Sequence, residues 1–107
     1  MIPTFFPAHK VKFLPDNPKT HRVQQHELDF WATQPAKLIG NCFISPGILK
    51  RVFFVDDYSI RSRKGNQYHI LYEDTGLDEV DDLDPQTVLA MVAEAELVEN
   101  MRPIPRP

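Results

Sequence analysis

The sequence contains few of the residues from which disulfides and membrane spans are built. Cys42 is its only cysteine, so the chain cannot form an internal disulfide, and we expect it to work in a reducing compartment. No run approaches the roughly 18 apolar residues of a membrane-spanning helix. The N-terminus has no basic region followed by an apolar core, so it does not read as a secretory signal. These absences predict a cytoplasmic protein that does not contact membranes.

The motifs of common enzyme classes are also missing. The chain has no G-x-S-x-G, no P-loop and no dinucleotide-binding fingerprint. His21 and His26 are five residues apart, which does not place them on one helical face as a zinc site would require. Cys42 and His69 could form a nucleophile pair if their strands were adjacent, although a free cysteine in a strand is usually a small buried hydrophobe. We therefore expect no enzymatic activity, no metal and no cofactor.

Charge is distributed unevenly along a chain whose net charge is only -3. Residues 1–72 hold ten Lys and Arg against five Asp and Glu, whereas residues 73–107 hold two against ten. The acidic half can pair with the basic half inside the fold. Alternatively, a basic face meets a polyanion and the acidic segment controls access to it.

The 107 residues, 42% of them hydrophobic, suffice for one modest core and therefore for one domain. Four prolines interrupt residues 1–19, which we expect to form an extended arm rich in proline and phenylalanine. This arm either packs its aromatic rings along the domain or binds a partner. The globular domain should then span residues 20–100, followed by a tail at residues 101–107.

Two helices are predicted at the ends of this domain. Residues 20–34 carry a partly apolar stripe, and Pro35 should end the helix. The second helix is predicted over residues 85–100. Asp84 and Pro85 are typical of a helix start, and Val88 and Val92 begin an apolar stripe.

Strands are predicted between the two helices, because β-branched and aromatic residues alternate there with polar ones. Residues 37–44 and 48–55 read as two strands, and residues 52–72 contain a β-hairpin with a polar turn at residues 62–66. Gly40 within the first strand suggests a bulge that would curl the sheet. The sequence thus predicts a mainly β, α+β fold: a small antiparallel barrel over residues 37–84, with one helix before it and one C-terminal helix.

Part of this region resembles the strand-and-turn signature of Tudor-like domains. The segment QYHILYEDTGLDEV (residues 67–80) places alternating apolar and aromatic residues before an acidic turn, as in the family's Tyr-x-Val-x-Tyr/Phe strand. The turn at residues 73–76 is one residue longer than the family's pattern. The resemblance implies a strongly bent, SH3-like barrel of about five strands with an aromatic cage for methylated Lys or Arg. Tyr68 and Tyr72 match the motif strand.

From these patterns we expect a binding module that recognises a protein or peptide through an aromatic barrel face and a basic hairpin tip. A nucleic-acid-associated barrel is one alternative, with cations contacting phosphates and tyrosines stacking on bases. An inhibitor that offers residues 73–84 as a polyanion mimic is another. The candidate binding residues are Tyr58, Tyr68, Tyr72, Arg61, Arg63, Lys64, Lys50 and Arg51.

Overall fold

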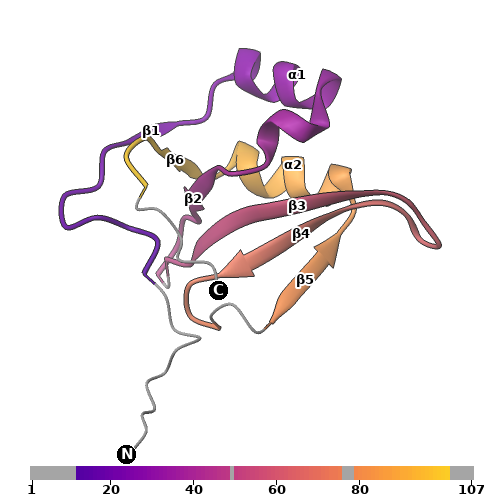
Figure 1. The fold of residues 1–107 in the computed structure, drawn as a ribbon. Coiled ribbons are helices and arrows are strands. Elements are labelled where there is room, and N and C mark those ends of the chain that lie inside the picture. The colour runs from indigo at the N-terminus through magenta and orange to yellow at the C-terminus, as the bar shows by residue number, and fades with distance from the viewer. Residues whose placement is uncertain (1–11, 49, 76–78, 102–107) are drawn as a thin grey trace, which may run out of the picture.

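In the part of the chain that the structure describes, one antiparallel sheet of six strands carries two α-helices on one face (Figure 1). The structure is a computed structural model that describes residues 12–48, 50–75 and 79–101; the side chains of Arg61 and Ser62 are not described. The strand order is β1-β6-β2-β3-β4-β5, and no pairing joins β1 to β5 within the described ranges. The predicted α+β class, dominated by antiparallel strands, is confirmed. The strands are β1 (Thr20–Arg22), β2 (Cys42–Ile44), β3 (Val52–Ser62), β4 (Gly65–Tyr72), β5 (Val80–Leu83) and β6 (Glu96–Val98).

The helix predicted over residues 85–100 is shorter than expected. Helix α2 spans Pro85–Ala93, with Pro85 in its first turn and the Asp84 carboxylate accepting the backbone N–H of Thr87 at 3.2 Å. Its start is therefore as the sequence predicts. Its end is not, because residues 96–98 form β6 between β1 and β2. No helix in the described part of the chain is long and apolar enough to span a bilayer.

The prediction of a helix over residues 20–34 is wrong at its beginning. Thr20–Arg22 forms β1, which pairs with β6, and helix α1 covers only Gln25–Thr33. Gln24 and Glu27 form a capping box, which starts the helix at this point. The partner of β1 lies more than seventy residues away, so the local pattern could not distinguish this strand from the first helical turn.

The strand predicted over residues 37–44 is also corrected. A 3-10 helix occupies Pro35–Leu38, and Gly40 lies in the following turn at φ 91°, so it is not a bulge inside a strand. Only Cys42–Ile44 is extended, as β2. The irregularities of strand pairing lie instead in β3, where the pairing with β4 shifts between Val55 and Asp57 and again between Ser59 and Ser62.

The segment predicted as a strand over residues 48–55 becomes extended only at Val52. From Val52 the chain continues as the single strand β3 to Ser62, so Asp56 and Asp57 mark a shift in register within one strand instead of a bend between two. Ile48 lies in the connection before β3 and is fully exposed.

Side chains from the two faces of the sheet enter separate hydrophobic clusters. Phe53 and Val55 face the helices, where they pack in one cluster with the helix residues Trp31, Val88 and Val92. Their strand neighbours Val52 and Phe54 point to the opposite face, where Phe13 from the N-terminal segment covers them. Phe13 is completely buried, and its backbone N–H donates to the Glu73 carboxylate at 2.6 Å. The described end of the predicted N-terminal arm is therefore part of the domain.

Candidate functional site

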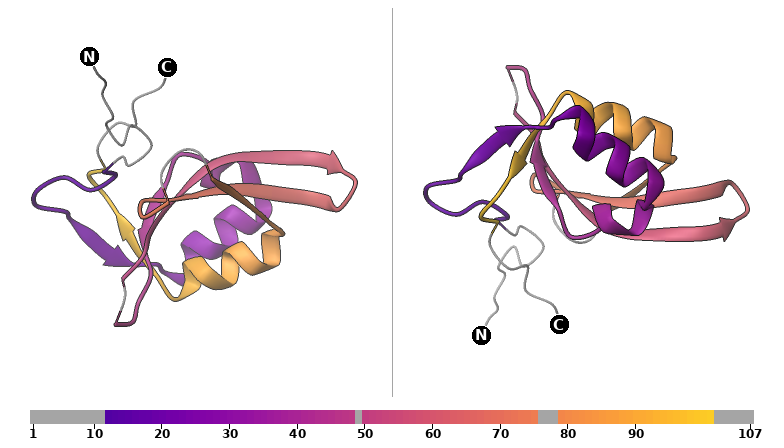
Figure 2. Two further views of the ribbon diagram at one scale, coloured as in Figure 1. Left: turned by 90° about the horizontal axis from the view of Figure 1, so that it is seen from below. Right: turned by 90° about the horizontal axis from the view of Figure 1, so that it is seen from above.

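The β3–β4 hairpin extends past the rest of the fold (Figure 2). Strand β5 pairs with β4 only from Leu71 to Tyr68, whereas β3 and β4 stay paired as far as Ser62 and Gly65. Residues 59–67, which we call the hairpin tip, therefore form a ribbon of two strands. A ribbon of this kind exposes both faces, so its side chains can reach a partner without disturbing the core.

The hairpin tip carries exposed cations and one exposed apolar side chain. Arg63 and Lys64 are exposed, and neither forms an ion pair with any described residue. Ile60 is 66% exposed. No Asp or Glu occurs between Tyr58 and Tyr72. Arg61 belongs to the same tip by sequence, but its side chain is outside the described part of the chain.

The three candidate tyrosines lie on the helix-covered face of the sheet, not on an open one. Tyr68 is 1% exposed, and Tyr58 and Tyr72 are half-buried against the same hydrophobic cluster. The rings of Tyr58 and Tyr68 lie 4.6 Å apart between centroids. Burial raises the pKa of Tyr68 to about 12, with Tyr58 adding to the effect. Tyr68 is thus a core residue.

Tyr72 and Arg51 interact with each other. The guanidinium carbon of Arg51 lies 3.7 Å from the centroid of the Tyr72 ring, a cation–π contact. The same guanidinium donates two hydrogen bonds of 2.9 Å to the Asp74 carboxylate. These hydrogen bonds lower the pKa of Asp74 and raise the pKa of Arg51. The charge of Arg51 is therefore already compensated within the fold.

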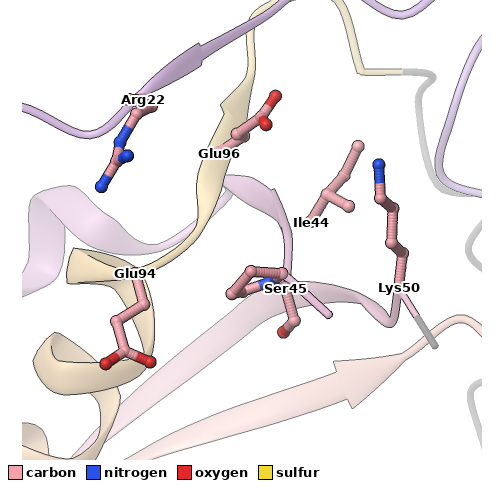
Figure 3. Close-up of a pocket in the computed structure, with 7 residues that line it drawn as sticks. Arg22, Ile44, Ser45, Lys50, Glu94 and Glu96 are labelled. Atoms are coloured by element: carbon pink, nitrogen blue, oxygen red, sulfur yellow. The ribbon is translucent and has the colours of Figure 1, made fainter. Parts of the chain in front are cut away.

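Lys50 lies at a hollow of about 370 Å³ whose lining includes no residue of the hairpin tip. Figure 3 shows the lining side chains. Arg22 and Glu96 are opposite each other there on β1 and β6. The Glu96 carboxylate accepts a hydrogen bond of 2.5 Å from the Thr20 hydroxyl. Two cations and two carboxylates share this hollow, so it has little preference for a polyanion. The lining residues are Arg22, Ile44, Ser45, Pro46, Lys50, Glu94 and Glu96. Arg51 is thus paired with Asp74, and Lys50 shares its hollow with Glu94 and Glu96. Of the described cations predicted for binding, only Arg63 and Lys64 have no such carboxylate beside them.

A second polar cluster lies on the sheet face that points away from the helices. Ser59 on β3, His69 on β4 and Asp82 on β5 form a continuous hydrogen-bonded chain. The Oγ–Nε2 distance between Ser59 and His69 is 2.5 Å, and Nδ1 of His69 bonds to Oδ1 of Asp82. His69 thus forms its hydrogen bonds with Ser59 and Asp82, and not with Cys42. The sequence carries no contiguous motif for this set, because three different strands contribute it.

The described residues include no group of side chains suited to bind a metal ion. Within the described ranges, no three His, Cys, Asp or Glu side chains are grouped as metal ligands would be. Cys42 is buried, and desolvation together with the charge of Glu73 raises its thiol pKa to about 12. Such a thiol is a poor nucleophile and a poor ligand at neutral pH.

Comparison with known proteins adds no family to these observations. The chain matches no protein-family model, no curated protein and no solved structure.

Proposed function

We propose that this protein is a binding module whose hairpin tip recognises an acidic patch on a protein partner. The observation that carries the proposal is the exposure of Arg63 and Lys64 on a projecting ribbon, without ion pairs to the described residues. Exposed charges of one sign raise the rate of association with a surface of the other sign. The proposal does not require the sheet to close into an SH3-like or Tudor-like barrel, because the tip lies beyond the main sheet.

A protein partner is favoured over a nucleic acid by what surrounds the cations. Ile60 is two-thirds exposed, and protein interfaces combine an apolar centre with a polar rim. Asp57 and Asp82 are exposed at the base of the same hairpin, where they would repel phosphates that approach along the ribbon. A partner that meets only the tip avoids this repulsion.

The test compares the wild-type chain with Arg63→Ser/Lys64→Ser as immobilised baits in extracts of the native host. The matched control is Lys12→Ser/Lys37→Ser, which removes two exposed cations elsewhere. A partner retained by the wild type and the control but lost by the tip variant supports the proposal. Its purified form should bind the tip variant on the order of tenfold more weakly, and the difference should shrink between about 50 and 200 mM salt.

A duplex DNA and a single-stranded RNA of random sequence are measured under the same conditions. Equal retention of every protein by all three baits would overturn the proposal. Loss of DNA or RNA binding in the tip variant, without loss of a protein, would assign the tip to nucleic acid instead.

A further inference from the structure

Ser59, His69 and Asp82 are placed together by strand pairing alone. His69 and Asp82 are directly opposite each other on β4 and β5. On β3 the partner of His69 is Asp57, and Ser59 lies two residues further along, on the same face of the sheet. His69 follows the buried Tyr68 and precedes the buried Ile70, so its ring points to the face away from the helices. The His69 side chain is 24% exposed and that of Asp82 is 50% exposed. The cluster is therefore accessible.

The pattern of bonds assigns a role to each group. A carboxylate only accepts hydrogen bonds, so Nδ1 of His69 donates to Asp82. In the neutral ring, Nε2 is then the acceptor for the Ser59 hydroxyl at 2.5 Å. This arrangement orients the base toward the proton that a nucleophilic serine must lose.

We propose that Ser59 is a nucleophilic serine that accepts an acyl group from a carboxylic ester, with His69 as its general base and Asp82 as a positioning residue. This activity does not rest on the partner proposed for the hairpin tip. It uses the sheet face at the base of that tip, and neither Arg63 nor Lys64 takes part.

The reaction balances without a cofactor. Oγ of Ser59 attacks the ester carbonyl carbon while its proton passes to Nε2 of His69. The carbon–oxygen bond to the leaving alcohol breaks, and that oxygen takes the proton from Nε2. Water then attacks the acyl-serine with His69 again as the base, which releases the carboxylic acid and restores the Ser59 hydroxyl.

Gln67 is placed to stabilise the oxyanion. It is the direct partner of Ser59 across β3 and β4, so both side chains point to the same face. No described residue accepts a hydrogen bond from its side-chain amide, so those donors are available to a developing negative charge. Phe13 covers this face of the sheet at Val52 and Phe54, whereas His69 and Asp82 are partly exposed. The cluster therefore offers no enclosed pocket, and the ester must present an unhindered carbonyl. Acetyl and other short acyl esters with good leaving groups meet that requirement.

The experiment treats the full chain with 4-nitrophenyl acetate and, separately, with a serine-directed fluorophosphonate, and locates the adduct by mass spectrometry. We expect an adduct at Ser59 and release of nitrophenolate. Ser59→Ala should abolish both, and His69→Asn should slow them by about 100-fold or more while leaving the serine in place. Ser45→Ala, at a partly buried serine in the connection between β2 and β3, is the matched control and should react like the wild type.

Asp82 is tested by a readout that a purely structural role would not change. Asp82→Asn should lower kcat with little change in KM, and Asp82→Glu should recover part of the loss. Circular dichroism and thermal midpoints establish that each variant is folded. If Ser59 in the folded wild type carries no adduct, or reacts no faster than Ser45, the cluster is only a cross-strand hydrogen-bond ladder and the proposal is overturned.

Discussion

The hydroxyl of Tyr68 donates a hydrogen bond to the backbone carbonyl of Pro35 at 2.9 Å. This bond ties the middle of β4 to the start of the 3-10 helix, thirty-three residues earlier in the chain. It satisfies the single polar group of a side chain that is 1% exposed. A residue that the sequence suggests for partner binding is thus a link between the sheet and the helical layer.

Tyr68→Phe should therefore lower the stability of the fold without weakening the binding of a partner to the hairpin tip. The change removes one hydrogen bond and leaves the Pro35 carbonyl without its donor, which should lower the free energy of unfolding by about 1 kcal/mol. Urea denaturation measures this loss. Tyr58→Phe is the control, because no hydrogen bond of the Tyr58 hydroxyl to a described residue is present. Loss of a captured partner by folded Tyr68→Phe would contradict the assignment of Tyr68 to the core.

Helix α2 should be essential to the domain. Val92 is completely buried between the helices and the sheet, so Val92→Asp places an uncompensated charge in the core. We expect a loss of about 3–5 kcal/mol, enough to unfold a domain of ordinary stability. Ala90→Asp changes an exposed position of the same helix and should have a far smaller effect. Similar melting midpoints for the two variants would show that α2 is not docked as described.

His21 should make stability depend on pH. Its ring bonds to Glu27 and Glu99, and these bonds raise the pKa of His21, Glu27 having the larger effect. A raised pKa means that the stabilisation is fully present below the unfolded value of about 6.5 and is lost as pH rises through the folded-state pKa. The stability gap between wild type and His21→Gln should thus be larger at about pH 6 than at about pH 8.5.

The gap should be about 1 kcal/mol or less, because the His21 side chain is 35% exposed and water screens the pair. His26→Gln, at an exposed histidine of helix α1, serves as the control. A gap that widens with increasing pH would mean that His21 does not act through its charged form.

Cys42 should report on unfolding. A thiol whose pKa is raised to about 12 has on the order of 1,000-fold less thiolate than one near its ordinary value, and its side chain is also buried. Ellman's reagent at about pH 8 should therefore react slowly with the native protein and rapidly in denaturant. Equal rates in both conditions would place Cys42 at the surface.

The amino-acid sequence predicts the elements that depend on neighbouring residues. Alternation of apolar and polar side chains specified the hairpin of β3 and β4, since side-chain direction in a strand has a period of two. Asp84 and Pro85 specified the start of α2, because they satisfy and pre-form the first helical turn. The basic character of the hairpin tip follows from composition alone.

The elements that depend on contacts between residues distant in sequence become visible only in the folded chain. Strands β1 and β6 have three residues each, too few for a pattern, and they are extended because they pair with each other and β6 also pairs with β2. The same pairing of distant strands brings Ser59, His69 and Asp82 into one hydrogen-bonded chain. It also turns Tyr68 toward the helices, since the register of a buried sheet fixes which face each side chain occupies.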